Sequence, residues 1–307
     1  MKHLKLIITI SLCCFLNILN IYSQSIIELY EESQEKIILG DYSSAIILLD
    51  KAIDIDPDNS DSYYLRALAK DISGNYKGAI LDYSKSIEIN PKNSEAYYHL
   101  GCISSDLGDH KIAISYYTNA IEINPEYSDA FLNRGMSKDI SGDNNGAIAD
   151  YNKAIEINPN LSEAYNNRGV AYEILGNYQS AISDYSKAIR INPAYSEAYY
   201  NRGIVKENLK NYIDAIGDFT KAIELNPNYT NSYINRGVAY VQLEYYDLAL
   251  SDFNYAIEIS PKNTDALYNR GILKIMINDA DSGCLDLLNA TKLGYIEKHD
   301  IIKNYCK

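Results

Sequence analysis

A heptapeptide that ends in proline recurs along this chain with a constant period. The sequence KAIEINP ends at Pro159, and close variants of it end at the six other prolines, which are Pro57, Pro91, Pro125, Pro193, Pro227 and Pro261. Successive prolines are 34 residues apart without exception. The length of 307 residues would allow two globular domains, but a fixed period of this size predicts stacked copies of one supersecondary unit.

One copy, residues 162–195, shows what that unit is. We expect Ser162 to cap a first helix, Gly176 and Asn177 to break it, and Pro193 to stop a second helix, because proline disfavours helical backbone at the residue before it. The second helix carries an apolar stripe at helical spacing, formed by Ala181, Ile182, Tyr185, Ala188 and Ile189. Each copy is therefore predicted to be two short antiparallel helices. Neither helix can bury its stripe alone, so the copies must stack.

This pattern resembles the tetratricopeptide repeat (TPR). The matching residues in the copy just described are Tyr165, Gly169, Ala181, Tyr185, Ala188 and Pro193. The resemblance covers residues 26 to about 294 and implies an all-α fold, a right-handed superhelical solenoid. It also implies that the first helix of each repeat (the A helix) lines a concave groove and that the second (the B helix) lies outside.

The predicted organisation has about eight repeats and two flanking segments. The repeats are 26–59, 60–93, 94–127, 128–161, 162–195, 196–229, 230–263 and 264–294, and residues 295–307 are predicted to form a C-terminal capping helix. The first repeat departs from the pattern at Ser33 and Leu49, and the last at Gly283. Such departures are typical of the ends of a repeat array, where one face has no neighbour.

Residues 1–25 have the layout of a secretory signal peptide. Lys2 and Lys5 precede an apolar run from Leu6 to Leu19, and short polar residues follow around Ser23. The alternative is an uncleaved membrane anchor, because the apolar run is nearly long enough to span a bilayer. We favour cleavage and expect an exported protein of the periplasm or cell envelope, which meets a membrane only if the segment is retained.

Charge and motifs limit the classes of function. The formal net charge of −13 disfavours unspecific binding to nucleic acid or to anionic lipid. The histidines, His3, His99, His110 and His299, show no metal-ligand spacing, and the sequence has no phosphate loop and no nucleophile motif. We therefore expect no enzyme, no cofactor and no metal.

A charged pair recurs in six of the repeats, at positions 7 and 23. We interpret it as a set of structural ion pairs between A and B helices, formed by Arg66 with Asp82, Arg134 with Asp150, Arg168 with Asp184, Arg202 with Asp218, Arg236 with Asp252 and Arg270 with Asp286. Repeats 1 and 3 lack both members of the pair. A ladder of arginines that binds anions is the alternative, and we favour it less because each arginine has a matched acid.

The resemblance places positions 2, 5, 9 and 12 of each A helix in the groove. Position 2 is mostly acidic, and asparagine recurs at position 6. The predicted peptide-binding groove is formed by Tyr64, Tyr98, Asn133, Asn166, Asn167, Tyr200, Asn201, Asn235, Tyr268, Asn269, Glu173 and Glu207. The position 2 acids can equally serve as helix-capping charges, and the tyrosines as packing. The asparagines are harder to explain structurally, since Asn is a poor helix former.

An acidic groove rich in Tyr and Asn predicts a protein or peptide ligand that is extended and neutral to basic. We therefore expect a non-enzymatic scaffold or assembly factor of the cell envelope. One alternative is a substrate-recruiting subunit of an envelope enzyme complex, whose chemistry lies in another chain. A less favoured alternative is an RNA-binding helical-repeat protein, because that class has a different period and a basic groove.

Two cysteines near the C-terminus form a candidate disulfide. If the predicted capping helix folds back antiparallel across the last B helix, Cys284 and Cys306 come together. Similar terminal repeats in exported proteins of the family carry such a pair, so the resemblance supports the bond. The alternative is two buried thiols. Cys102, in the third repeat, is expected to stay reduced.

Overall fold

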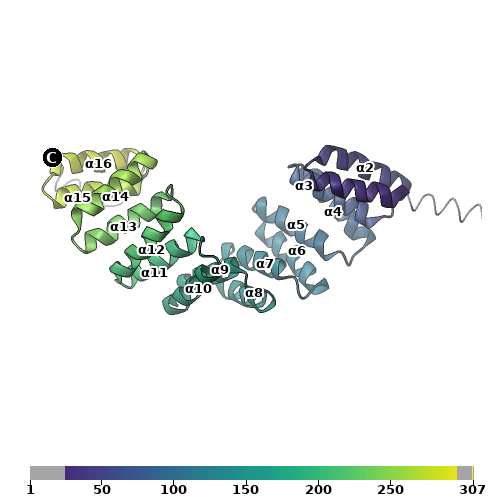
Figure 1. Ribbon diagram of the computed structural model, residues 1–307, viewed down its shortest axis with the longest axis horizontal. Coiled ribbons are helices and arrows are strands. Elements are labelled where there is room, and N and C mark those ends of the chain that lie inside the picture. The colour runs from purple at the N-terminus through teal and green to yellow at the C-terminus, as the bar shows by residue number, and fades with distance from the viewer. Residues whose placement is uncertain (1–24, 296–305, 307) are drawn as a thin grey trace, which may run out of the picture. The chain divides into compact units, whose positions relative to one another are not determined.

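The computed structural model describes residues 25–295 and 306 (Figure 1). The chain divides into two compact units, unit 1 up to Asp143 and unit 2 from Asn144, and each is considered by itself. The regular secondary structure of the described residues is α-helical, and successive helices pack against one another, which confirms the predicted all-α repeat fold. The predicted signal peptide and capping helix lie largely outside the described residues. Of the first segment only Ser25 is described, and of the second only Tyr295 and Cys306.

Unit 1 begins with helical residues 25–38. Its further helices are α2 (Tyr42–Ile55), α3 (Ser60–Ile72), α4 (Tyr76–Ile89), α5 (Ser94–Asp106), α6 (His110–Ile123) and α7 (Ser128–Ile140). Helix α3 packs on α4 and α5 on α6, as the A and B helices of one repeat. Each B helix also packs on the A helix that follows it, as α2 does on α3 and α6 on α7.

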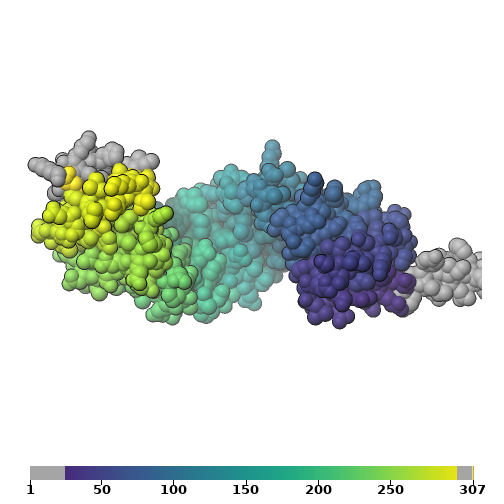
Figure 2. Space-filling view, turned by 90° about the horizontal axis from the view of Figure 1, so that it is seen from above, coloured from purple at the N-terminus to yellow at the C-terminus, as the bar shows by residue number. Residues whose placement is uncertain are grey.

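Unit 2 continues the same pattern. Its helices are α8 (Asn144–Ile157), α9 (Ser162–Ile174), α10 (Tyr178–Ile191), α11 (Ser196–Asn208), α12 (Tyr212–Leu225), α13 (Thr230–Gln242), α14 (Tyr246–Ile259), α15 (Thr264–Met276) and α16 (Ala280–Lys292). The A helices α9, α11, α13 and α15 also contact one another in order, so they share one face of the unit, here called the A-helix face. In unit 1, α5 and α7 make the same contact. Within each unit the repeats join into a continuous surface, coloured in sequence order in Figure 2.

The core of most repeats is an aromatic ring packed against small residues, while Leu49 and Leu287 fill the ring position in the first and last repeats. Tyr185 on α10 is fully buried, and a Cβ atom added to Gly169 on α9 would lie 2.7 Å from its Cε1. Ala181 and Ala188 flank the ring position on α10 and are also fully buried. Glycine at position 169 therefore allows the close approach of this helix and ring, whereas repeat 2 has Ala67 at the equivalent position beside Tyr83.

The helix starts differ from the prediction by one residue. Ser162 is the first residue of α9 and not its cap, since the N-cap is Leu161, whose side chain accepts no capping hydrogen bond. A side-chain cap occurs where asparagine stands at the corresponding position, as at Asn93, whose Oδ1 accepts a hydrogen bond from the amide of Ala96. The predicted cap at Ser162 was wrong, because the helix already begins at this residue.

The turn between the A and B helices needs a left-handed residue. Gly176 supplies it with a φ of 75°, whereas Lys210 takes the same conformation, with a φ of 61°, one repeat later. Glycine adopts such backbone without a steric penalty, and lysine does not. The later repeats of unit 2 keep the same turn geometry although they lack the glycine and incur this penalty.

Candidate functional site

The five ion pairs within single units are built alike. Arg168 donates two parallel hydrogen bonds of 2.7 Å from Nε and Nη2 to the carboxylate of Asp184. The same two-bond contact, at 2.7–2.9 Å, joins Arg66 to Asp82, Arg202 to Asp218, Arg236 to Asp252 and Arg270 to Asp286. The sixth predicted pair, Arg134 with Asp150, has one member in each unit and stays a prediction.

Each of these arginines also reaches the preceding repeat, which the sequence analysis missed. Its remaining nitrogen, Nη1, donates to a polar side chain at position 25 of the B helix before it, as Arg202 does to Ser186 at 2.9 Å and Arg236 to Thr220 at 3.0 Å. The recurrence of Asp, Asn, Ser or Thr at position 25 was the available signal. The arginines therefore join one repeat to the next as well as helix to helix.

The aspartates of these five pairs are buried. Burial by itself would raise the pKa of Asp286, but hydrogen bonds from Arg270 and Lys274 outweigh it and lower the pKa. Since arginine and carboxylate satisfy each other, the layer offers no free arginine ladder among these five residues. The arrangement supports the structural interpretation of the pairs.

Three of the position 6 asparagines, Asn133, Asn201 and Asn235, have unforeseen structural partners on the preceding A helix. Asn133 donates to the hydroxyl of Tyr98 at 3.0 Å, and Asn235 donates to that of Tyr200 at 3.2 Å. In each case the acceptor stands 35 residues earlier, on the preceding A helix. The asparagine ladder thus ties neighbouring A helices together.

Asn166 requires a correction of its predicted role. Its side chain is fully buried, accepts a hydrogen bond from Asn201 at 3.2 Å and donates to Asn167 at 3.3 Å. A side chain enclosed in this way holds the stack together and presents no surface to a ligand. The other predicted groove residues keep partly exposed side chains: Tyr64, Tyr98, Asn133, Asn167, Tyr200, Asn201, Asn235, Tyr268, Asn269, Glu173 and Glu207.

Tyrosines from the turns between repeats complete the A-helix face. Tyr127 packs on Tyr98 with ring centroids 4.9 Å apart, and Tyr229 packs on Tyr200 at 4.7 Å. Tyr268 stacks on Tyr295 at 4.5 Å. Tyr127 and Tyr229 were not among the predicted groove residues, although tyrosine recurs at that repeat position. Each pair presents two adjacent rings, a good surface for an apolar or cationic side chain.

The exposed acids at position 2 lie close to these tyrosines. Burial raises the pKa of Tyr229 to about 12, with Tyr200 and Glu197 contributing. Burial also raises the pKa of Tyr127, and the carboxylates of Glu95 and Asp129 add to the shift. Both observations place negative charge beside the paired rings, so the A-helix face of each unit is acidic and aromatic.

Two position 12 carboxylates on the A helices accept a hydrogen bond from a tyrosine. Tyr185 donates to Glu173 at 2.9 Å, and Tyr83 donates to Asp71 at 3.4 Å. Burial raises the pKa of Glu173, and the bond from Tyr185 partly offsets this. Glu207 has no such donor, and burial alone raises its pKa to about 7.

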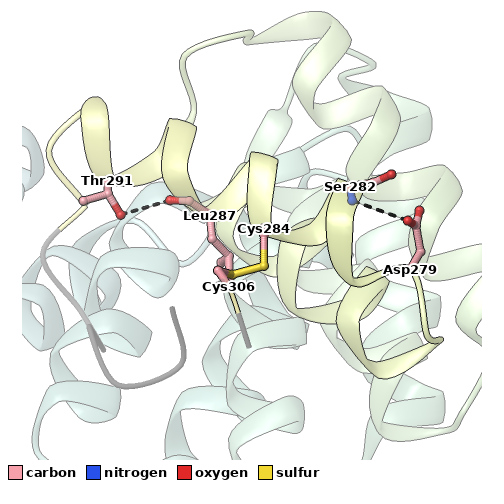
Figure 3. The surroundings of a disulfide bond; sticks show 6 residues. All are labelled: Asp279, Ser282, Cys284, Leu287, Thr291 and Cys306. Carbon is pink, nitrogen blue, oxygen red and sulfur yellow. Dashed lines mark hydrogen bonds between the residues drawn. A yellow bond between two sulfur atoms is a disulfide. The ribbon is translucent and has the colours of Figure 1, made fainter. Parts of the chain in front are cut away.

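The last repeat is closed by a disulfide bond. Cys284, near the start of α16, is bonded to Cys306, with their Cα atoms 5.4 Å apart and a sequence separation of 22 (Figure 3). Helices α15 and α16 approach closely at two glycines, since a Cβ atom on Gly283 would lie 2.6 Å from the carbonyl oxygen of Gly271. This contact explains why glycine replaces the usual alanine at position 283. Cys102 is a free thiol.

The described residues hold no group of three or more His, Cys, Asp or Glu side chains that could bind a metal ion. Among the same residues, His99 lies parallel to the ring of Tyr83 with centroids 5.4 Å apart, and its pKa is lowered by burial. Within the part of the chain that the structure covers, each helix is too short or too polar to cross a membrane.

Comparisons with known structures identify proteins of similar fold. The chain is 27% identical to YrrB, described as a TPR protein with an unusual peptide-binding site, over 58% of this chain and 92% of that one, with a TM-score of 0.50. It is 28% identical to MamA over 53% of this chain and 95% of that one, also with a TM-score of 0.50. Pseudomonas aeruginosa PilF, at 21% identity and a TM-score of 0.61, covers 69% of this chain and 97% of its own, and shows the fold alone. None of the curated proteins matches the sequence.

Models of the repeat family match along most of the described chain. Tetratricopeptide repeat models match residues 29–59, 48–80, 94–127, 162–195, 196–229 and 230–263, and a further TPR repeat model matches 72–103 and 140–176. The matches agree with the helix pairs, the glycine–aromatic contacts and the proline turns described above. On this evidence the chain belongs to the tetratricopeptide repeat family.

Proposed function

We propose that this protein is an exported, non-enzymatic scaffold or assembly factor of the cell envelope. In this proposal its A-helix face binds an extended, neutral-to-basic segment of a partner protein. The observation that carries the proposal is the combination of paired tyrosines, such as Tyr200 with Tyr229, and exposed acids on the A helices of one unit. Rings with polar edges anchor peptide side chains, and the acids favour positive charge.

The family supports a role in protein binding. The similarity to YrrB, whose description names a peptide-binding site, points to a peptide as the ligand. The asparagines add to this, because Asn201 and Asn235 use one amide N–H each in the stack, and their other polar atoms are left for a peptide backbone. Export is supported by the signal-like residues 1–25 and by the disulfide between Cys284 and Cys306, a bond typical of oxidising compartments.

The proposal can be tested with a peptide selection. The chain lacking residues 1–25 is immobilised, random dodecapeptides displayed on phage are selected against it, and the selected peptides are measured by calorimetry. The peptides are expected to be rich in Lys, Arg and aromatic residues and to bind less tightly as salt rises. A selection that returns no binder, or only acidic binders, would contradict the proposal.

Two triple variants with equal charge changes locate the binding surface. One carries Glu163→Gln, Glu197→Gln and Asp265→Asn, which are exposed on A helices of unit 2. The other carries Glu156→Gln, Glu224→Gln and Glu258→Gln, which are exposed on B helices of the same unit. The first triple should weaken peptide binding about tenfold, from exposed charges worth roughly 0.2–1 kcal/mol each. The second should leave it within about twofold, and equal losses would move the interface away from the A-helix face.

A further inference from the structure

One carboxylate on the A-helix face of unit 2 has lost the partner that its equivalents keep. In repeat 5 the ring of Tyr185 packs against Gly169, and its hydroxyl reaches Glu173 at 2.9 Å. In repeat 6 the ring of Phe219 packs in the same way, since a Cβ atom on Gly203 would lie 2.6 Å from its Cε1. Phe219 is fully buried and has no hydroxyl, so Glu207 has no donor at this place.

The next repeat shows that the mismatch is confined to repeat 6. There Phe253 again fills the aromatic position, and the residue equivalent to Glu207 is the apolar Val241. Repeat 7 has therefore replaced both members of the pair, whereas repeat 6 has replaced only the donor. The carboxylate of Glu207 stays partly exposed and makes no hydrogen bond or ion pair with the described residues, so it is free to accept both from a bound molecule.

The neighbouring cations among the described residues are already engaged. Lys206, next to Glu207 in sequence, pairs with Asp218 on α12 at 2.7 Å, and Arg202 binds the same aspartate. On α13, Arg236 is bound to Asp252 in the same way. Titratable groups that share the A-helix face with Glu207 include acidic and phenolic ones: Glu173 on α9, held by Tyr185 of α10, and Tyr200 on α11.

Tyrosine rings share the A-helix face with this carboxylate. Tyr200 and Glu207 stand seven residues apart on α11, about two turns, and hence on the same side of that helix. Burial raises the pKa of Tyr200, and the carboxylates of Glu207 and Glu173 act on it in the same direction. Tyr229 packs on Tyr200 with centroids 4.7 Å apart. A planar guanidinium can bond a carboxylate through two N–H groups and stack on an aromatic face at the same time, which an ammonium cannot do as well.

We propose that Glu207 is the specificity-determining residue of the A-helix face in unit 2 and receives an arginine side chain of the bound segment, on the same side of α11 as Tyr200. The inference rests on the proposed function and adds to it a defined anchor. Arginine binding stabilises the ionised form of Glu207. At a pH where the carboxyl of the free protein is protonated, binding therefore requires the release of that proton. With a pKa of about 7 in the free protein, affinity rises about tenfold between pH 6 and pH 8, following the ionised fraction.

The test uses a small probe rather than the unknown partner. N-acetylarginine amide is titrated into the chain lacking residues 1–25 at pH 6, 7 and 8, and binding is followed by NMR. N-acetylcitrulline amide, which has the same shape without the charge, is the matched control. The arginine probe is expected to bind more tightly as pH rises and the citrulline probe to show no pH dependence.

Three variants assign the effect to Glu207. Glu207→Gln should abolish the pH dependence, and Glu224→Gln, exposed on the B helix α12, should leave it unchanged. Phe219→Tyr restores the hydroxyl that Tyr185 supplies to Glu173, and should move the midpoint of the pH dependence below 7 because a donor favours the ionised carboxyl. Equal binding of the two probes, or a pH dependence that survives Glu207→Gln, would overturn the inference.

The result also separates this inference from the proposed function. If selected peptides bind the A-helix face but the arginine probe ignores Glu207, the scaffold proposal stands and the anchor is rejected. If the arginine probe binds at Glu207 and no peptide can be selected, the anchor stands and the peptide-binding proposal is rejected.

Discussion

Arg168 and Asp184 lie 16 residues apart and are joined by two parallel hydrogen bonds of 2.7 Å. The aspartate is 6% exposed, so its charge depends on the arginine for compensation. Because the same contact recurs in four other repeats, this layer is the main polar contact between A and B helices and the place where a single substitution should cost most.

The first prediction concerns this pair. Arg168→Ala should destabilise the protein by about 3–5 kcal/mol, because it leaves a buried carboxylate without its partner. The double change Arg168→Leu with Asp184→Tyr copies Leu100 and Tyr116 of repeat 3 and should cost less than either single change. Urea unfolding of the four proteins gives the double-mutant cycle, and additive losses would show that the two side chains do not interact.

Two glycines give a matched test of the packing. Gly169→Ala should destabilise the protein by about 1–3 kcal/mol, since the new methyl group would collide with the ring of Tyr185. Gly217, inside α12, has nothing within 4 Å of an added Cβ atom. Gly217→Ala should therefore stabilise the protein by about 0.5–1 kcal/mol, because alanine has a higher helix propensity than glycine. Thermal unfolding measures both, and a loss of stability in Gly217→Ala would contradict the account.

The helix pairs and the five ion pairs within single units follow closely from the sequence because each is repeated with a fixed period. Apart from the cap at Ser162, the features that were not predicted depend on neighbouring repeats. Asn201 bonds a residue 35 positions earlier, and Arg202 reaches Ser186 across a repeat junction. Such contacts depend on the stacking geometry, which one repeat taken alone does not contain. The role of Tyr229 was missed for the same reason, since its ring belongs to a turn and packs on an A helix.

The disulfide predicts a thiol count. The chain lacking residues 1–25 should show one reactive thiol, that of Cys102, when unfolded without reductant. Breaking the bond by Cys284→Ser with Cys306→Ser should cost about 3 kcal/mol in the chain-entropy model, which treats the bond as closing a loop of about 20 residues. Three reactive thiols in the oxidised protein would contradict the assignment.

The raised pKa of Glu207 makes the protein less stable as pH rises. Its carboxyl ionises near 4.5 in the unfolded chain and near 7 in the folded one. Folding therefore takes up a proton between these values, and the contribution of Glu207 to stability is lost as pH rises through 7. Glu207→Gln should match the wild type at pH 4.5 and be more stable by about 1 kcal/mol at pH 8, after allowance for solvent screening. Urea midpoints across this range check it, and a difference that grows toward acidic pH would contradict the sign.

The most direct test of the central claim is to map where a bound peptide lies. A selected peptide that carries a benzophenone side chain is irradiated with the chain lacking residues 1–25, and the cross-linked residues are found by mass spectrometry. We expect cross-links on the A helices and their adjoining turns, at residues such as Tyr200, Tyr229 and Glu207. Cross-links confined to the B helices α10, α12 and α14 would contradict the claim that the A-helix face binds the partner.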